Sequence, residues 1–91
     1  MKKSYYAIIP SNVRYDSTLT PNAKLLYGEL TALANQEGYC WASNGYFSEL
    51  YSATTRSISK WISQLAAQGY INIELIYEGK QVKQRRIWIA E

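Results

Sequence analysis

An apolar stripe in the second half of the chain limits the possible folds more than any other feature. Its members recur at i, i+3, i+4 and i+7, the spacing of a helix face that packs on a core. The stripe consists of Ile58, Trp61, Ile62 and Leu65. We predict a helix over residues 55–68 with Thr54 as its N-cap, because the threonine oxygen can accept a backbone N–H of the first turn. Gly69 then supplies a left-handed residue that ends the helix in a Schellman motif, with Tyr70 packing back on it.

A shorter helix is predicted immediately before this one, over residues 44–51. Ser43 is its expected N-cap. An alanine precedes each cap and can pack on the fourth residue of the helix that follows. Because only residues 52–54 separate the two helices, the pair has the pattern of a helix-turn-helix.

A third, longer helix is predicted near the start of the chain. Thr20 and Pro21 begin it, since threonine is a good cap and proline at the first helical position costs no hydrogen bond. Its apolar period continues to Glu37, and Gly38 would end it. Gly28 inside this helix costs roughly 1 kcal/mol relative to alanine, which a close helix crossing would explain.

The remaining segments suit short strands and loops. Residues 39–41 lie between a helix end and a helix start, so they have room only for a strand of two or three residues. After the second helix of the pair the apolar period falls from 3.6 to 2, which predicts strands at 71–77 and 83–89. Residues 5–10 are apolar and end at a proline, which fits an edge strand or an extended arm. Residues 12–19 are predicted to form a loop.

The register of the two final strands follows from parity. Apolar residues of both strands share one face only if the connection is odd, because a slip of one residue inverts a strand. We therefore predict a five-residue loop, residues 78–82, with Ile73 opposite Ile87 and Glu74 opposite Arg86. The order helix, strand, helix, helix, strand, strand then predicts an α+β winged helix-turn-helix. It comprises three helices, a short strand and a two-stranded wing hairpin in one domain over residues 1–91.

The charges are concentrated in the second half of the chain. Ten lysines and arginines against seven acids give a net charge of +3. Residues 1–51 hold four of each sign, whereas residues 52–91 hold six cations and three acids. A polyanion would therefore meet the second helix and the wing first.

Candidate DNA-contacting residues gather in these two places. They are Ser43, Asn44, Thr54, Thr55, Arg56, Ser57, Ser59 and Lys60 in the helical pair, and Lys80, Lys83, Arg85 and Arg86 in the wing. Arg56 suits base readout, because its planar fork matches guanine O6 and N7. Ser57 is expected to brace the first turn, whereas Lys60 suits a phosphate, as do Ser43 and Asn44 at the exposed start of the preceding helix. Ser63 and Gln64 are interpreted as solvated positions, and ion pairs with acids explain the wing cations equally well.

Catalytic and cofactor chemistry have no support in the sequence. The chain has no histidine, which excludes histidine-based acid–base catalysis and histidine metal ligands. Cys40 is the single cysteine, so it can form neither an internal disulfide nor a zinc site alone. It fits a buried residue in a reducing cytoplasm. No phosphate-binding glycine motif is present and no apolar run approaches the roughly 18 residues that span a membrane. We expect a non-enzymatic, cytoplasmic protein without a cofactor or metal.

The segments LTPNAKLLYGEL and GYCWASNGYF, with TTRSISKWISQLAAQGYI, make the chain resemble a known family. It is similar to the N-terminal winged-helix domain of phage and plasmid replication initiator, or replisome-organiser, proteins. The resemblance implies sequence-specific binding of double-stranded DNA at a replication origin. It also implies a homodimer, for which the segment from Tyr5 to Ile9 and the helix from Pro21 are the expected contacts. A C-terminal domain that recruits host replication proteins would follow, so the chain is expected to be part of a longer protein.

Three alternatives stay open. A transcriptional regulator would use the same fold and the same contacts. A protein-interaction module would show no salt-dependent DNA binding. Single-stranded DNA could stack on aromatic side chains, of which Tyr77 and Trp88 are the ones expected to be exposed.

Overall fold

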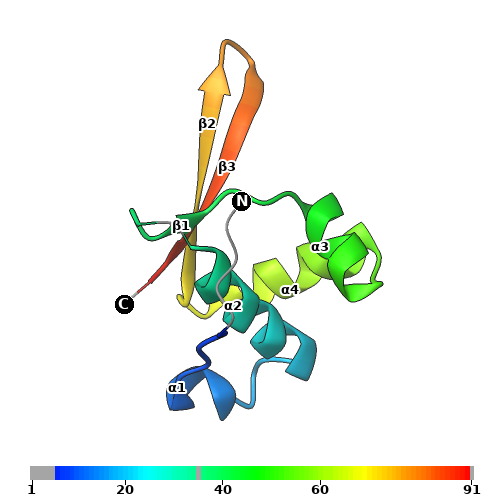
Figure 1. Ribbon diagram of the computed structural model, residues 1–91, viewed down its shortest axis with the longest axis vertical. Coiled ribbons are helices and arrows are strands. Elements are labelled where there is room, and N and C mark those ends of the chain that lie inside the picture. Colours follow the sequence, from blue (N-terminus) through cyan, green and yellow to red (C-terminus); the bar gives the residue numbers. More distant parts are fainter. Residues whose placement is uncertain (1–5, 35, 91) are drawn as a thin grey trace.

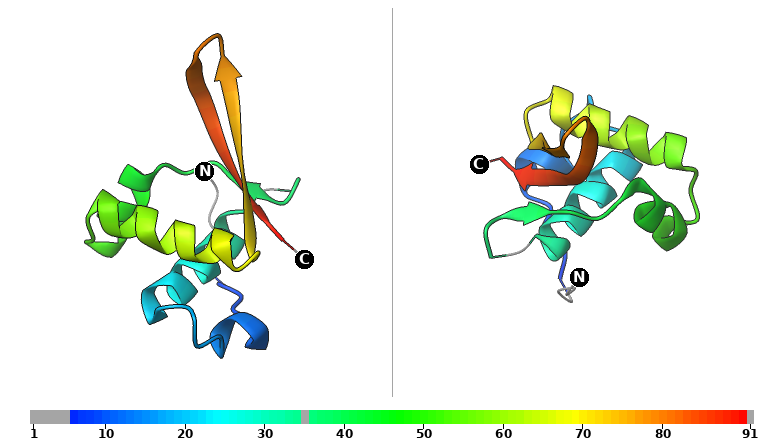
Figure 2. Two further views of the ribbon diagram at one scale, coloured as in Figure 1. Left: turned by 180° about the vertical axis from the view of Figure 1, so that it is seen from behind. Right: turned by 90° about the horizontal axis from the view of Figure 1, so that it is seen from above.

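The computed structural model describes residues 6–34 and 36–90, and it contains the predicted elements in the predicted order after one additional helix (Figure 1). The elements are α1 (Ser11–Arg14), α2 (Pro21–Leu33), β1 (Tyr39–Cys40), α3 (Asn44–Tyr51), α4 (Thr55–Ala67), β2 (Ile71–Glu78) and β3 (Gln81–Ile89). The helices gather at one end of the molecule, and the β2–β3 hairpin projects away from them (Figures 1 and 2). This is an α+β fold with the arrangement of a winged helix-turn-helix. Within the described residues, no helix combines the length and the apolar character needed to cross a bilayer.

The core lies where α2, α3 and α4 meet the base of the sheet. Phe47 of α3 and Ile58 and Leu65 of α4 are fully buried, as are Ile71 and Ile87 at the start of β2 and near the end of β3. Burying one such side chain contributes about 1.5–3 kcal/mol. The apolar stripe predicted for α4 therefore faces the core as expected.

The predicted helix starts are confirmed by their hydrogen bonds. Thr20, Ser43 and Thr54 each accept a backbone N–H from the third residue after them, at 3.1–3.2 Å. These bonds satisfy donors that a helix cannot satisfy itself. The end of α4 is equally well defined, because Gly69 has φ +79° and the N–H of Tyr70 bonds to Leu65 O at 3.0 Å, as in a Schellman motif.

Tyr70 also attaches the loop before α2 to the end of α4. Its hydroxyl donates to Asp16 Oδ2 at 2.6 Å and to Asn12 O at 3.0 Å. Hydrogen bonds from Thr18 and Tyr70 lower the pKa of Asp16, and the bond to Asp16 raises the pKa of Tyr70. Segments more than fifty residues apart are thereby held together at the edge of the core.

The expectation of a loop over residues 12–19 is wrong at its start. α1 is a single turn, in which the N–H groups of Val13 and Arg14 bond to Pro10 O at 3.0 and 2.8 Å. Its one buried side chain is Val13. A helix of four residues is too short to show an apolar period, so its sequence reads as a loop.

α2 ends at Leu33, not at Glu37 as predicted. Ala34 already has extended backbone angles, φ −61° and ψ 131°. The chain leaves the helix so that β1 can reach β3, where Cys40 pairs with Ile87. The apolar period of α2 cannot show where the helix must end for β1 to pair with β3.

Gly38 therefore does not end the helix. It has φ +93° and lies in the turn that leads into β1. Glycine is needed there because a side chain at this φ would clash with the backbone. β1 covers only Tyr39 and Cys40, since Trp41 already leaves the ladder.

The predicted register is confirmed at the base of the wing. The sheet is antiparallel with the order β1–β3–β2, and Ile73 lies opposite Ile87 and Glu74 opposite Arg86. The face that carries Ile87 is buried at its base, where Ile71 and Ile87 belong to the core, whereas Ile73 on the same face is exposed at 43%.

The five-residue loop is wrong at the tip. Pairing continues to Glu78 and Gln81, which leaves a two-residue turn that begins at Gly79, with φ +64°. The register shifts between the pairs that Ile76 and Tyr77 form, where β3 holds one extra residue. This bulge supplies the odd residue that parity demands, so a tight turn and the correct base register coexist.

The N-terminal arm, residues 6–10, runs over α2 and explains Gly28. A Cβ at Gly28 would lie 3.0 Å from Ile9 Cγ1 and 3.1 Å from Ala7 Cβ. The arm is held by a hydrogen bond from its backbone to Thr31 Oγ1 of α2, at 2.9 Å. The close neighbour of Gly28 is thus the arm and not the crossing helix that we expected. Tyr5, part of the predicted strand and dimer contact, lies outside the described residues.

Candidate nucleic-acid interface

The outer face of α4 is exposed and polar, and it carries no acid. Four exposed residues on this face recur at i, i+3, i+4 and i+7, the mirror of the buried stripe. They are Arg56, Ser59, Lys60 and Ser63, which we call the outer face of α4. Among residues 6–34 and 36–90, no hydrogen bond or ion pair engages any of the four side chains. Figure 2 (left) shows α4 on the side turned to the viewer, not covered by another element. These side chains are available to a ligand.

Ser63 is a member of this face that the sequence interpretation set aside as a solvated position. Its place seven residues after Arg56 is the signal that identifies it, because residues at i and i+7 share a helix face. Thr55 is also exposed, at the first position of α4. A ligand along the helix would therefore meet hydroxyl donors beside two cations.

Two of the predicted contact residues are used within the first turn of α4. Thr54 accepts the backbone N–H of Ser57 at 3.1 Å and donates its hydroxyl to Ser57 Oγ at 3.0 Å. The expectation that Ser57 braces the turn agrees with this geometry. Both side chains fix the helix start and thereby the direction of Arg56.

A glutamine fixes α4 against α2. The Thr20 hydroxyl donates to Gln64 Oε1 at 2.9 Å, and the Thr20 N–H approaches the same oxygen at 3.3 Å. Gln64 is half-buried and is not the solvated position that the sequence suggested. The cap of one helix therefore sets the placement of the other.

Side-chain hydrogen bonds also fix the two ends of α3. Ser43 caps it, and Asn44 Oδ1 accepts a hydrogen bond from Arg85 Nη1 at 2.7 Å. At the other end the Tyr51 hydroxyl donates to Glu29 Oε1 of α2 at 2.9 Å. Burial and this bond raise the pKa of Tyr51. The amide oxygen of Asn44 is thus occupied within the protein, whereas Ser43 stays exposed at the helix start.

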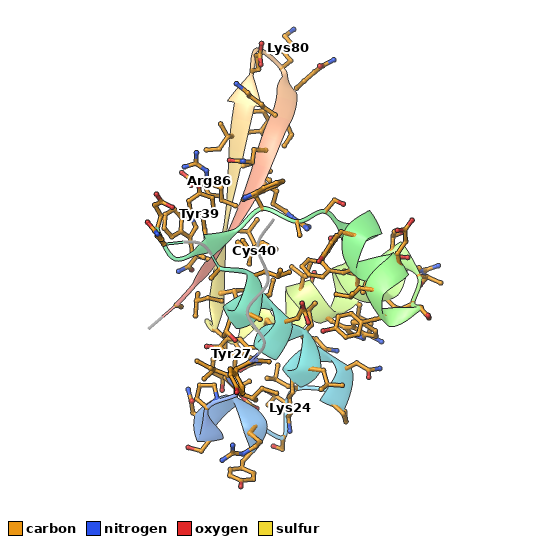
Figure 3. All side chains as sticks on the ribbon, in the orientation of Figure 1. Lys24, Tyr27, Tyr39, Cys40, Lys80 and Arg86 are labelled. Carbon is orange, nitrogen blue, oxygen red and sulfur yellow. The ribbon has the colours of Figure 1, made fainter. Side chains whose placement is uncertain are left out.

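Lys80 and Lys83 are the wing cations that remain accessible. Lys80 lies at the tip of the hairpin (Figure 3) and, among the described residues, has no hydrogen bond or ion pair. Lys83 lies 3.8 Å from Glu78, but both side chains are more than half exposed. Such a surface pair contributes at most about 1 kcal/mol, so a phosphate can displace the carboxylate.

Arg85 and Arg86 are engaged inside the protein. Arg85 is half-buried, donates to Asn44 and to Ala42 O at 2.8 Å, and has its pKa lowered by burial. Arg86 lies over the ring of Tyr39, 4.7 Å from its centre, and 3.9 Å from Glu74 (Figure 3). Neither guanidinium is presented as the free phosphate-binding cation that the charge pattern suggested.

The aromatic side chains of the wing differ from each other. Tyr77 is exposed at 58%. Trp88 is half-buried, since its ring lies 4.8 Å from that of Tyr39 and its Nε1–H donates to Glu74 at 3.1 Å. The expectation that Trp88 is exposed is therefore wrong. The Trp88 ring offers little surface on which a base could stack.

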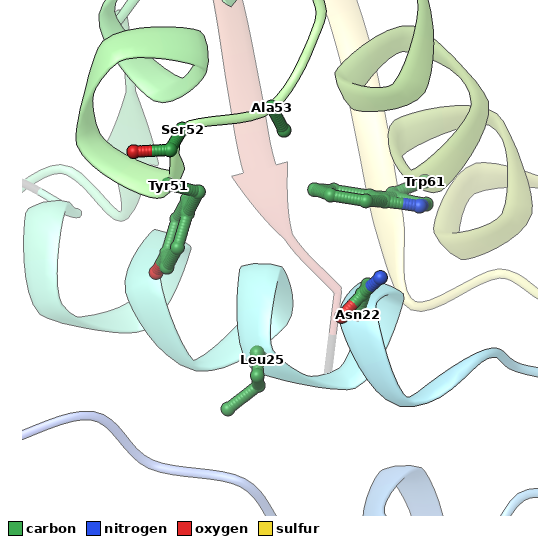
Figure 4. A pocket seen from close by; sticks show the side chains of 6 residues that line it. All are labelled: Asn22, Leu25, Tyr51, Ser52, Ala53 and Trp61. Carbon is green, nitrogen blue, oxygen red and sulfur yellow. The ribbon is translucent and has the colours of Figure 1, made fainter.

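An open hollow of about 430 Å³ lies between α2, the turn after α3 and α4 (Figure 4). Its lining consists of Asn22, Leu25, Tyr51, Ser52, Ala53 and Trp61. Trp61 forms one wall and is half-buried there. This tryptophan therefore faces α2 and does not belong to the outer face of α4.

Cys40 is buried and unpaired by any disulfide. Burial raises the pKa of its thiol, which keeps the group protonated and unreactive. The interpretation of Cys40 as a small core residue is confirmed.

Comparison with known protein families gives one match. A family model described as a helix-turn-helix domain matches residues 17–71. This range extends from the loop before α2 to the first residue of β2, and it contains the three packed helices. Searches of curated proteins and of solved structures find no significant match.

Proposed function

Because this chain belongs to the helix-turn-helix domain family, a DNA-binding fold, we propose that it binds double-stranded DNA sequence-specifically through the outer face of α4. The observation that carries this proposal is a helix face that is exposed, free of acids and without partners among the residues that the structure describes. α4 has 13 residues and is about 20 Å long, which suits the major groove. The chain would act as a binding protein and not as an enzyme.

The residues of this face have distinct proposed roles. Arg56, in the first turn, reads a guanine with its planar fork. Lys60 lies one turn further along and binds a phosphate. Ser59 and Ser63 supply short hydroxyl donors to bases or phosphates.

The wing extends this interface. Lys80 and Lys83 would reach phosphates beside the groove that α4 occupies, as would the exposed hydroxyl of Ser43 from the body of the domain. With Lys60, the wing supplies three phosphate contacts, and Arg56 would make a fourth if it touched the backbone. The logarithm of the association constant is then expected to fall with the logarithm of salt concentration at a slope of about −2.7 to −3.6. So few contacts bind weakly, which favours a second copy or repeated sites.

We further propose a role in replication initiation at a phage or plasmid origin. The resemblance of the segments around α2 and α3 to replication initiators supports this role, as does the accessible outer face. A homodimer would use the N-terminal arm with α2, since Tyr6 and Ile8 are exposed at 80% and 63% and the core does not need them. Host replication proteins would be recruited by a further region of the protein.

Selection from random double-stranded DNA at two salt concentrations tests DNA binding. We expect an enriched sequence and a salt slope near −3. The double variant Arg56→Gln, Lys60→Gln should abolish enrichment, whereas Lys24→Gln removes a cation from α2 and should leave it unchanged. Absence of both enrichment and salt dependence in the wild type would exclude DNA binding and favour a protein-interaction module.

A plasmid assay separates replication from transcription. The selected sequence is inserted as repeats into a plasmid that lacks its own initiator, and plasmid maintenance is measured with the full-length protein present. Replication that depends on these repeats supports the proposal. Regulation of a neighbouring promoter without plasmid maintenance would favour a transcriptional regulator instead.

A further inference from the structure

The wing is weakly attached to the rest of the sheet. β1 contributes only the pairs of Tyr39 with Trp88 and of Cys40 with Ile87. From Ile87 toward the tip, the wing is a ribbon of two strands that leaves the helices behind (Figure 1). A two-stranded hairpin is marginally stable alone, so its direction depends on contacts made by side chains.

Arg85 makes such a contact at the point where the wing leaves the body. Its two terminal nitrogens each donate a hydrogen bond, Nη1 to Asn44 Oδ1 at 2.7 Å and Nη2 to Ala42 O at 2.8 Å. Both acceptors belong to the segment that starts α3, more than forty residues away in sequence. A planar guanidinium that donates to two fixed acceptors defines an orientation as well as a distance.

An open groove lies between the wing and the start of α3, and Arg85 is part of its lining. The groove has a volume of about 460 Å³ and separates residues 41–44 from residues 82–85. The two hydrogen bonds that Arg85 donates join the wing to the start of α3. Partial burial lowers the pKa of Arg85, which agrees with its half-buried side chain.

Arg86 contacts the body from the opposite face of the wing. Successive residues of a strand point to opposite faces, so Arg85 and Arg86 diverge. Arg86 lies over the ring of Tyr39 of β1, whereas Arg85 reaches the start of α3. The wing is therefore held on both faces near its base.

We propose that Arg85 is a positioning residue that sets the angle between the wing and α4, so that Lys80 and the outer face of α4 reach one DNA together. This inference rests on the proposed DNA binding for its functional part. Arg85 itself does not contact DNA. Arg85 acts by connecting two parts of the protein: its hydrogen bond to Asn44 joins it to α3 and the helices, and β3 joins it to the tip of the wing.

Residual dipolar couplings of the free protein test the structural part. In the wild type, one alignment tensor should fit the amides of α2, α4 and the wing. In Arg85→Lys, which keeps the charge but loses the fork, the wing amides should deviate while α2 and α4 still fit. Asn44→Ala removes one of the two acceptors and should give a smaller deviation of the same kind. Lys83→Gln is the matched control on the same strand and should give none.

DNA affinity tests the functional part through a comparison of two lysines. Lys80→Ala should reduce the salt slope by about 0.9 in the wild type and leave it unchanged in the Arg85→Lys background, because a misdirected wing no longer reaches the phosphate. Lys60→Ala, on α4, should reduce the slope by the same amount in both backgrounds. This comparison also shows that Arg85→Lys remains folded.

The outcomes are distinct. Unchanged wing couplings in both Arg85→Lys and Asn44→Ala would overturn the inference, whatever the DNA data show. A full effect of Lys80→Ala in the Arg85→Lys background would overturn its functional part. If the wild type binds no DNA, the proposed function fails and the functional part with it, while the couplings still decide whether Arg85 directs the wing.

Discussion

Replacing the two cations of the outer face of α4 separately provides the sharpest test of the interface. Arg56 and Lys60 lie one turn apart, carry the same charge and, among the described residues, have no internal partner. Alanine is a good helix former, so both substitutions should leave the free energy of unfolding within about 0.5 kcal/mol of wild type. Differences in DNA binding then report contacts and not folding.

The two variants are expected to differ in kind. Arg56→Ala should cost about 1–3 kcal/mol on the selected sequence, or roughly 5- to 150-fold, and much less on a scrambled sequence. Lys60→Ala should weaken binding to both sequences equally and lower the salt slope by about 0.9. Fluorescence anisotropy with the selected and the scrambled duplex, at about 50 and 200 mM salt, measures the affinity for each sequence and the salt slope.

Equal, sequence-independent losses for the two variants would contradict base readout by Arg56 and make it a second phosphate contact. No loss for either variant, with wild-type binding intact, would show that DNA binds elsewhere on the molecule. The first outcome would leave α4 as a phosphate-binding helix without base readout, and the second would withdraw the proposal that α4 is the recognition helix.

Three further predictions concern the framework. Hydrogen bonds from Thr18 and Tyr70 lower the pKa of Asp16, so its stabilisation is present above the unfolded pKa near 3.8 and is lost as pH falls through the lower folded pKa. Asp16→Asn should therefore lower the melting temperature at pH 7, and the difference from wild type should shrink as the solution is made more acidic than the unfolded pKa. Gly28→Ala places a methyl 3.0 Å from the arm, which should displace the arm and speed hydrogen exchange of the Ile8 amide despite a gain of roughly 1 kcal/mol in helix propensity. Tyr51→Phe removes the hydroxyl that bonds to α2 and should cost about 1 kcal/mol in urea denaturation.

The elements that sequence predicts best are those with several agreeing local signals. α4 has an apolar stripe, a threonine cap and a glycine stop, and all three are found in the structure. The base of the wing follows from parity, because Ile73 and Ile87 must share a face. The end of α2 is missed, since the pairing of β1 with β3 decides it and no local residue signals it.

The same contrast holds for the candidate site. The place of Arg56 on an exposed helix face follows from its position relative to the buried stripe. The internal contacts of Arg85 cannot be seen from charge alone, because its partners Asn44 and Ala42 are brought to it only by folding. Parity does contain a signal: Arg85 lies two residues before Ile87 and therefore shares the inward face of β3. A cation on an inward face indicates a structural contact before it indicates a ligand.

The four side chains of the outer face of α4 make no hydrogen bond or ion pair within residues 6–34 and 36–90, whereas the other faces of the helix contact the core, the cap of α2 and the turn. Substitutions at these four outward positions are therefore energetically uncoupled from the interior. The sequence preference of the proposed DNA interface can therefore change there one residue at a time, with no compensating change elsewhere, which makes this helix face a suitable place to engineer new specificity.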